Sequence, residues 1–346
     1  MARILVAGAG AIGASIAYQL SLRGARDVAL CDRAQIASGS TGKAMGGVRQ
    51  QFSTAAEVRL AQASIRFFEE LGPPLFEQVG YLFLATTGEG LARLEDRAAM
   101  QRELGVPVEP VDASSVAGLR TDDVVGAWGC WEDGVAEPAE ITRELVRRAV
   151  ERGVDVRERT DARELERDIL VIASGAASPE LWPGLPIRPL CRQLVDVGPV
   201  AGLPADLPMT IEEESGFHFR RRGATLRLAM PEPAARWTEE ELVDEAIVED
   251  KRRRLAHRHP PAADAPVVRA WAGLYDMTPD AHPIIGPVAD GVYVAAGFSG
   301  HGFMQSPAVG AAVAEELLEG SSEFDLSPYR LERFEAGAVF PEQLVL

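Results

Sequence analysis

Three glycines near the N-terminus have the spacing of a nucleotide-binding turn. Gly8, Gly10 and Gly13 follow a short apolar segment and precede a helical pattern that ends at Gly24. The first glycine permits a tight bend, the second lets backbone approach a pyrophosphate, and the third lets helix pack on strand. Asp32, which follows the next apolar segment, could accept a hydrogen bond from a ribose hydroxyl and disfavours NADP. This order predicts a dinucleotide site and leaves NAD and FAD both open.

Two further glycine-rich segments could also contact a cofactor. Residues 37–52 (ASGSTGKAMGGVRQQF) could wrap a second face of it, with a flexible surface loop as the alternative. Residues 297–307 (GFSGHGFMQSP) place three glycines around His301. We expect Ser306 as N-cap and Pro307 as first residue of the helix that follows, with its positive dipole end beside the glycines. The alternative for these glycines is close packing of a helix on a strand.

Composition and charge restrict the class of protein. The chain has 346 residues, of which 47% are hydrophobic and 25% charged, as in a globular protein of two lobes. A formal net charge of −17 disfavours nucleic acid and anionic membranes as partners. No segment has the ~20 apolar residues of a membrane span and no signal peptide is evident, so we expect a cytoplasmic protein. The cysteine spacing predicts free thiols and no metal site.

The middle of the chain contains both helical patterns and strand patterns. Residues 137–153 predict an amphipathic helix, and ILVIASGAAS predicts a strand that leads into a turn at Ser174 and Gly175. Short alternating segments between residues 191 and 230 predict antiparallel strands. The run from Lys251 to Arg254 is interpreted as a solvated helix face, with a binding patch as the alternative.

These motifs give the chain a resemblance to a known family. The loop 37–52, DGVAEPAEITRELV, ILVIASGAAS and above all WAGLYDMTPDAHPIIGPV and VYVAAGFSGHGFMQSPAVG resemble the D-amino-acid oxidase superfamily of FAD-dependent amine oxidoreductases. The likeness runs from about Arg3 to about Leu318. It is most similar to the branch of sarcosine oxidases, the β subunits of bacterial sarcosine oxidase, and archaeal-type L-proline dehydrogenase.

The resemblance implies an α/β fold with an α+β second lobe. We expect a glutathione-reductase-like FAD fold with a Rossmann-like parallel sheet and a shortened β-meander, an antiparallel-sheet substrate domain, and the flavin ring at their junction. The predicted FAD-binding domain comprises residues 1–75, 138–190 and 266–346, and the predicted substrate domain comprises 76–137 and 191–265.

The residues expected to bind FAD lie in the glycine-rich turns and at helix starts. The segment 297–302 is expected to pass along the flavin ring, with the following helix pointing its N-terminus at the pyrimidine side. The full set is Gly8, Gly10, Ala11, Ile12, Gly13, Asp32, Arg33, Ser40, Thr41, Gly46, Gly47, Ser174, Gly175, Gly297, Ser299, Gly300, His301, Gly302, Phe303 and Met304.

The resemblance implies oxidation of a C–N bond to an imine by hydride transfer to flavin N5, with oxygen or another electron acceptor as second substrate. Arg49 matches the family position that binds a substrate carboxylate and could do so through two hydrogen bonds; the alternative is a solvent-facing helix arginine. His301, Tyr275, Arg227 and His218 are further candidates, and each could instead have a purely structural place.

The sequence departs from the sarcosine oxidase pattern at several positions. Gly273 stands where the cysteine that attaches FAD is expected, and Lys43 stands near a position used for histidine attachment, so we expect non-covalent FAD. Arg227 and Met304 replace lysines that promote reaction with oxygen and bind the substrate. Oxidase activity and sarcosine as substrate are therefore left open.

Two other functions are kept as alternatives. The short segment before ILVIASGAAS could leave a surface for another chain, so the protein could be the flavin-bearing subunit of a hetero-oligomeric amine dehydrogenase, or a homo-oligomer. A nicotinamide-dependent dehydrogenase is the second alternative, which the additional glycine-rich segments disfavour.

Overall fold

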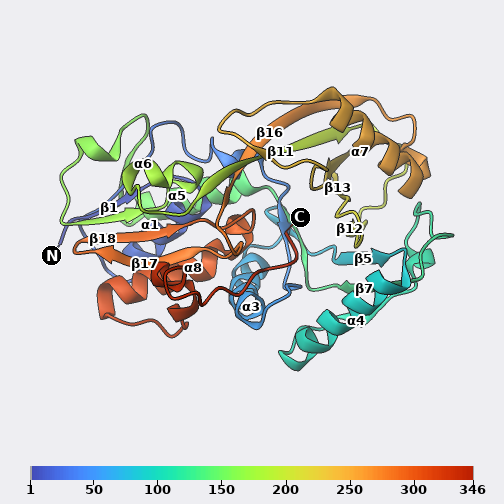
Figure 1. The fold of residues 1–346 in the computed structure, drawn as a ribbon. Helices are drawn as coiled ribbons and strands as arrows, with labels where there is room; N and C mark the ends of the chain where they lie inside the picture. The colour runs from blue at the N-terminus through green and yellow to red at the C-terminus, as the bar shows by residue number, and fades with distance from the viewer. Residues whose placement is uncertain (1, 346) are drawn as a thin grey trace. The chain divides into compact units, whose positions relative to one another are not determined.

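The computed structural model describes residues 2–345, which form two compact units. The first unit contains residues 2–44, 137–190 and 274–345, and the second contains residues 45–136 and 191–273. Each unit is thus assembled from segments that are far apart in the sequence, as the colours of Figure 1 show. These bounds differ from the predicted domains chiefly in residues 45–75 and 266–273, which belong to the second unit. The roles of the units as FAD-binding and substrate domains stay a prediction.

The first unit is built on a largely parallel sheet in the order β17-β18-β10-β1-β2-β9. All neighbours pair in parallel except β17 and β18, which form an antiparallel hairpin. The central strands are continuous apolar runs because helices or loops cover both faces of a parallel sheet. The strands are β1 (Ile4–Ala7), β2 (Val28–Cys31), β9 (Asp155–Arg157), β10 (Ile169–Ile172), β17 (Ile284–Ala289) and β18 (Val292–Ala296).

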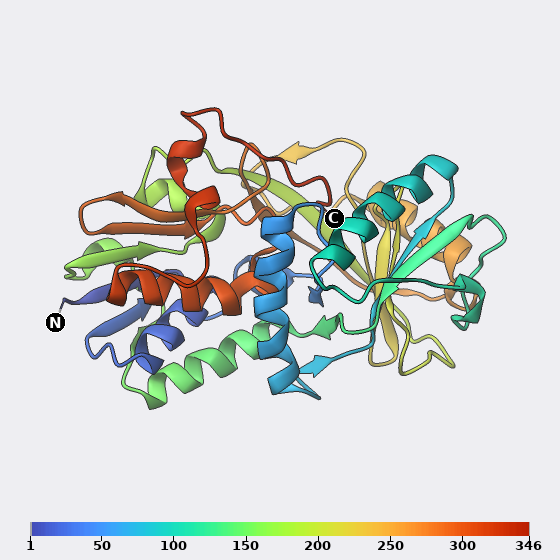
Figure 2. The same ribbon diagram turned by 90° about the horizontal axis from the view of Figure 1, so that it is seen from below.

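Helices of the first unit pack around α1 (Ala11–Leu22). This helix contacts α5 (Pro138–Glu151) and α8 (Gly302–Glu319), which are green and red in Figure 2. Gly310 of α8 faces Ser15 of α1, and a Cβ at Gly310 would overlap that serine, so the two helices approach closely. The short helices α2 (Ser40–Lys43) and α6 (Ser178–Leu181) lie in loops.

The connection from β9 to β10 contains only a 3-10 turn, η2 (Ala162–Glu164), among its described residues. Ala162, Leu185 and Ile187 pack with the apolar side chains of β1, β10 and β18 and close that face of the sheet. No strand lies in this described segment, where the resemblance had implied a shortened β-meander.

The second unit is dominated by a mostly antiparallel sheet in the order β15-β11-β14-β13-β12-β5-β7-β6, with β16 also paired to β11. Its bounds are β5 (Tyr81–Ala85), β6 (Glu109–Pro110), β7 (Gly126–Cys130), β11 (Arg188–Val197), β12 (Met209–Glu212), β13 (His218–Arg222), β14 (Thr225–Ala229), β15 (Arg236–Trp237) and β16 (Val267–Met277). A smaller sheet joins β3 (Gly47–Val48), β8 (Gly134–Ala136) and β4 (Phe76–Glu77). The parallel and antiparallel sheets confirm the predicted fold class.

The helices of the second unit are α3 (Ala55–Leu71), α4 (Gly88–Glu103) and α7 (Glu245–Arg258). Val248 and Leu255 of α7 pack on Phe219 and Leu228 of the large sheet and form its core on that face. Among residues 2–345, no helix combines the length and hydropathy needed for a membrane span.

Candidate cofactor and substrate sites

The turn between β1 and α1 is shaped to receive a ligand at the start of a helix. Gly8 has φ +111°, and a Cβ there would overlap the carbonyl oxygen of Ala173. A Cβ at Gly13 would overlap the carbonyl oxygen of Gly8. Gly10 is the N-cap of α1, and the first turn carries no acidic residue. The positive end of the helix dipole therefore faces the turn, where a pyrophosphate would be stabilised.

Asp32 is tied to this turn from the end of β2. Its Oδ2 accepts a hydrogen bond from the N–H of Ala9 at 2.8 Å, and Oδ1 accepts one from Ala34 at 2.7 Å. Each carboxylate oxygen has a second lone pair, so Asp32 can still accept from a ribose hydroxyl. Arg33 instead makes two hydrogen bonds to the Glu180 carboxylate, at 2.6 and 3.0 Å.

The loop that contains α2 reaches back to the same turn. The N–H of Ala11 donates to Thr41 Oγ1 at 3.1 Å, and Ser40 Oγ donates to the carbonyl of Leu274 at 2.6 Å. From the end of β10, Ser174 Oγ donates to the carbonyl of Ala7 at 3.0 Å. The predicted nucleotide-binding residues of the first unit thus gather at the carboxyl ends of β1, β2 and β10. They are Gly8, Gly10, Ala11, Ile12, Gly13, Asp32, Arg33, Ser40, Thr41, Ser174 and Gly175.

The glycine-rich segment 297–302 follows β18 and is held by Asp276, which sequence reasoning missed. The Asp276 carboxylate accepts from the N–H of Gly297 at 2.8 Å, while its backbone carbonyl accepts from Ser299 at 3.3 Å. Burial raises the pKa of Asp276 above its ordinary value. The only signal in the sequence is a single acid inside the apolar strand pattern WAGLYDMT, which does not reveal what the acid contacts.

Tyr275 and His301 flank the same segment. The ring of Tyr275 lies against Gly300, which has φ +95°, and a Cβ at Gly300 would overlap that ring. His301 is buried and occupies the N-cap position of α8, with its backbone N–H donating to the carbonyl of Phe298 at 2.9 Å. An aromatic ring therefore packs against this glycine segment within the first unit, and the place of the segment along the flavin ring stays a prediction.

The predicted start of the last helix is wrong. α8 begins at Gly302, so Ser306 and Pro307 lie inside it instead of at its N-cap and first position. Pro307 has no N–H to donate to the carbonyl of Phe303, and the Ser306 hydroxyl donates to that carbonyl at 2.9 Å instead. The serine thus replaces the missing backbone bond, and the helix can start one turn earlier. Gly302, Phe303 and Met304 form its first turn, directly after the glycine segment.

Arg49, in the second unit, lies directly after β3 and is 2% exposed. The alternative of a solvent-facing helix arginine is wrong. Its Nη1 donates to the carbonyl of Gln51 at 2.6 Å, and its guanidinium carbon lies 4.3 Å from the centre of the Phe52 ring. Stacking on an aromatic ring keeps the plane of a guanidinium fixed. The arrangement suits recognition of a carboxylate.

The strand β3 that precedes Arg49 brings Gly46 and Gly47 against the large sheet. Gly47 pairs with Val135 of β8, and a Cβ at Gly47 would overlap the hydroxyl of Tyr81. The N–H of Ala136 donates to the carbonyl of Gly46 at 2.8 Å. These two predicted cofactor residues belong to the second unit, and their role toward FAD stays a prediction.

Arg227 and His218 share one face of the large sheet. Arg227 pairs in register with Arg220 of β13, and alternation along β13 places His218 on the same side as Arg220. Phe219 and Leu228 point to the opposite side, toward α7. Arg220, a charged member of this face that the sequence did not single out, donates from Nε to the carbonyl of Met45 at 2.6 Å.

The two predicted residues on this face have different partners. Arg227 makes a buried, two-point ion pair with Asp196 of β11, at 2.9 and 3.0 Å, and lies over the Trp271 ring. His218 Nδ1 lies 2.8 Å from the carbonyl of Gly216. Burial lowers the pKa of His218 to about 4, so the ring is neutral at neutral pH. Arg227 therefore already has an anionic partner, and His218 adds a neutral imidazole to the face.

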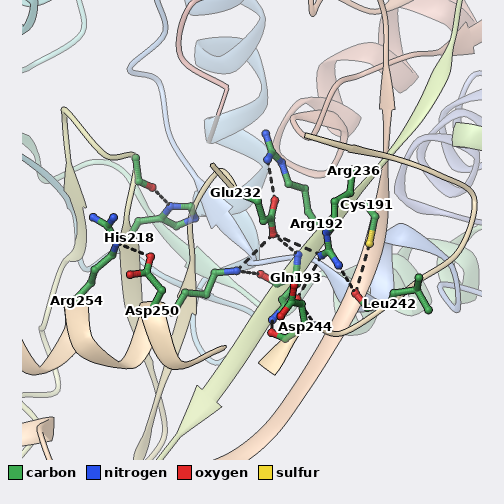
Figure 3. A network of polar contacts seen from close by, with 12 residues as sticks. Cys191, Arg192, Gln193, His218, Glu232, Arg236, Leu242, Asp244, Asp250 and Arg254 are labelled. Carbon is green, nitrogen blue, oxygen red and sulfur yellow. Dashed lines mark hydrogen bonds and ion pairs between the residues drawn. The ribbon is translucent and has the colours of Figure 1, made fainter. Parts of the chain in front are cut away.

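Lys251 is not on a solvated face, contrary to prediction. It is fully buried, donates to the carbonyl of Gln193 and lies 3.5 Å from Glu232, which also forms an ion pair with Arg192 at 2.8 Å. Figure 3 shows Glu232 of this network with its partners Arg192 and Gln193, which belong to β11. Burial lowers the pKa of Lys251 to about 8. The carboxylate and carbonyl compensate the buried charge, whereas Arg254 pairs with Asp250 near the surface.

A family model described as FAD dependent oxidoreductase (DAO) matches residues 3–316. The chain therefore belongs to the DAO family of FAD-dependent oxidoreductases, and FAD is its cofactor. The glycine cradle and the N-terminus of α1, whose N-cap is a glycine and whose first turn carries no acidic residue, fit the diphosphate of that cofactor. The match does not support the nicotinamide-dependent alternative.

Individual relatives cover nearly the whole chain. The FAD-dependent oxidoreductase domain-containing protein 1 of Bos taurus is 29% identical over 99% of this chain and 87% of its own length. A glycine oxidase of Geobacillus kaustophilus is 27% identical over 95% of this chain and 96% of its own. The crystal structure of L-proline dehydrogenase from P. horikoshii, 28% identical, superposes with a TM-score of 0.91 over 98% of this chain and 99% of that one.

Proposed function

We propose that the protein oxidises the C–N bond of an amino acid or secondary amine to an imine, which water then hydrolyses. The observation that carries the proposal is Arg49, whose buried guanidinium is oriented by the Phe52 ring and the Gln51 carbonyl. A buried cation of this geometry suits a substrate that carries a carboxylate. The names of the similar glycine oxidase and L-proline dehydrogenase support the same class of substrate.

The residues of this chain would divide the work between binding the cofactor and orienting the substrate. Bound FAD supplies the acceptor for the hydride that leaves the carbon next to nitrogen. The turn from Gly8 to Gly13 would bind its diphosphate without a covalent link, because Gly273 offers no sulfur. The N-terminus of α8 would favour negative charge beside the glycine segment. Arg49 would hold the substrate carboxylate.

The remaining candidates have narrower roles in this proposal. His218 is neutral at neutral pH, so it would line the substrate face of the second unit without adding charge. Arg227 keeps its charge on that face while paired with Asp196. Tyr275 and His301 would line the glycine segment of the first unit.

The test is the anaerobic visible spectrum of the FAD-loaded protein before and after addition of L- and D-amino acids, N-methyl amino acids and the corresponding amines without a carboxylate. We expect one amino-acid class to bleach the flavin band and its decarboxylated counterpart to act far more slowly. Admission of air then distinguishes oxygen from another acceptor. Equal bleaching by both members of a pair would contradict the role of Arg49. Reduction that requires a co-purified chain would favour the partner-dependent subunit.

A further inference from the structure

Asp133 is a completely buried carboxylate whose hydrogen bonds all run to the segment that follows Arg49. Its Oδ1 accepts from the backbone N–H of Gln50 at 2.9 Å and from Gln50 Nε2 at 3.4 Å. Its Oδ2 accepts from Gln51 Nε2 at 3.0 Å. Burying a carboxylate is costly unless such donors replace water, so the carboxylate of Asp133 depends on this segment for its hydrogen bonds.

The support for Asp133 itself is rigid. Its backbone carbonyl accepts from the N–H of Gly80 at 2.8 Å, and the next residues form β8, which pairs with β3 immediately before Arg49. On the other side of Arg49, the carbonyl of Phe52 accepts from Gln101 Nε2 at 2.9 Å. The backbone around Arg49 is thus held by β8 before it, by Asp133 directly after it, and by α4 beyond.

The connection from Asp133 to the guanidinium is short. Gln51 receives both contacts, because its side-chain amide donates to Asp133 and its backbone carbonyl accepts from Arg49 Nη1. A shift of Gln51 would therefore move the acceptor that orients the guanidinium.

We propose that Asp133 is a positioning residue that fixes Arg49 for binding a substrate carboxylate. The inference rests on the proposed function of Arg49. Asp133 acts through the Gln50 and Gln51 amides and does not itself touch the substrate.

The charge of Asp133 makes this positioning sensitive to acid. Burial raises the pKa of Asp133 to about 6, while the amides of Gln50 and Gln51 and the charge of Arg49 oppose the rise. The other titratable group beside it is the buried thiol of Cys130, whose pKa is raised by burial and by Asp133, so it stays neutral. Protonation below about pH 6 would turn one acceptor oxygen into a donor facing an amide N–H.

The experiment measures binding of benzoate, a carboxylate that cannot be oxidised at a C–N bond, by calorimetry with the FAD-loaded protein. Benzamide serves as the neutral probe, and Asp122→Asn, at an exposed acid, as the matched variant. We expect Asp133→Asn to weaken benzoate binding about tenfold, because the new NH2 group meets the donors of Gln50 or of Gln51 donor to donor. Benzamide binding and the Asp122→Asn variant should change less than about threefold.

A donor–acceptor exchange tests the mechanism directly. Gln51→Glu alone places two carboxylates together and should also weaken benzoate binding. Gln51→Glu combined with Asp133→Asn restores one donor opposite one acceptor, and we expect affinity to return to within about threefold of the wild type. Additive losses in the double variant would refute the positioning role.

The wild-type protein offers a second measurement that does not depend on any variant folding. Benzoate affinity should fall between pH 7 and pH 5, about tenfold, although benzoate stays ionised. A flat profile, or unchanged binding by Asp133→Asn, overturns the inference and leaves the proposed function standing. If wild type and Arg49→Met bind benzoate equally, the role of Arg49 itself fails and the inference fails with it.

Discussion

At the scale of single residues, the orientation of the Arg49 guanidinium can be tested most directly. Lysine keeps the charge but lacks the planar fork and the stacking on Phe52. We expect Arg49→Lys to raise KM for a carboxylate substrate about 10- to 100-fold with a smaller change in kcat, since the loss of one charged hydrogen bond is about 1.5–3 kcal/mol. Steady-state kinetics with Arg253→Lys, an exposed position, as control would show it. An unchanged KM would contradict carboxylate binding by Arg49.

Buried histidines give the molecule an acid-sensitive stability. Burial lowers the pKa of His259 to about 4 from 6.5, and its Nδ1 lies 3.0 Å from the carbonyl of Gly118. Between pH 6.5 and 4 the unfolded chain binds a proton that the folded chain does not, so stability is full above pH 6.5 and falls by about 3 kcal/mol toward pH 4. Urea unfolding at several pH values should show that the free energy of unfolding falls less steeply with decreasing pH in His259→Gln than in the wild type. Equal slopes in both proteins would count against this assignment.

Asp133 contributes the opposite sign to the same pH range. Its folded pKa of about 6 exceeds the ordinary 3.8, so between these values the folded chain binds the extra proton and the burial penalty is relieved. The pH dependence of the free energy of unfolding therefore combines the contributions of His259 and Asp133. The ligand-binding profile separates them, because only Asp133 is connected to Arg49.

Sequence reasoning found Arg49 but not Asp133, Asp276 or Arg220. Arg49 was found through its place in a motif, whereas the other three became visible only when strands placed them beside the segments they hold. A lone acid in an apolar pattern gives no indication of its distant partner. The prediction of a solvated Lys251 was wrong for the same reason, since its partner Glu232 is nineteen residues earlier along the chain.

At the scale of elements, the start of α8 shows how two valid local signals compete. Ser-Pro is a common helix start, but here the Ser306 hydroxyl supplies the bond that Pro307 cannot make. We expect Ser306→Ala to lower the free energy of unfolding by about 1 kcal/mol. The same change in a Pro307→Ala background should cost less, because the restored N–H can bond to Phe303. A double-mutant cycle by urea unfolding checks this, and additive effects would speak against the compensation.

At the scale of the whole molecule, FAD binding and stability are linked. A ligand present at 100 times its Kd adds about 2.7 kcal/mol to the stability of the folded state. Gly13→Ala would place a methyl group against the carbonyl of Gly8, so we expect loss of FAD and of the FAD-dependent rise in Tm. Gly88→Ala, where a Cβ meets open space, is the matched control. Equal rises in Tm for both variants would contradict the placement of the diphosphate at this turn.

The general architecture was predictable because apolar periodicity and glycine spacing repeat over whole segments. The antiparallel strands follow from such patterns, whereas the parallel sheet and the short connection between β9 and β10 were implied by the resemblance to a known family. The grouping of residues 45–75 with the second unit could not be predicted in this way, because it depends on contacts with residues far along the chain, such as the pairing of β3 with β8.

The interleaving of the two units also restricts the order in which they can fold during translation. The second unit has its last described segment in place at residue 273, whereas the first needs β18 beside β10 and α8 against α1. A nascent chain would therefore carry an unfinished N-terminal sheet until about residue 319 has left the ribosome. β1 and α1 are translated well before β18 and α8 complete the same unit, and a chaperone that shields β1 and α1 during elongation would have that interval in which to act.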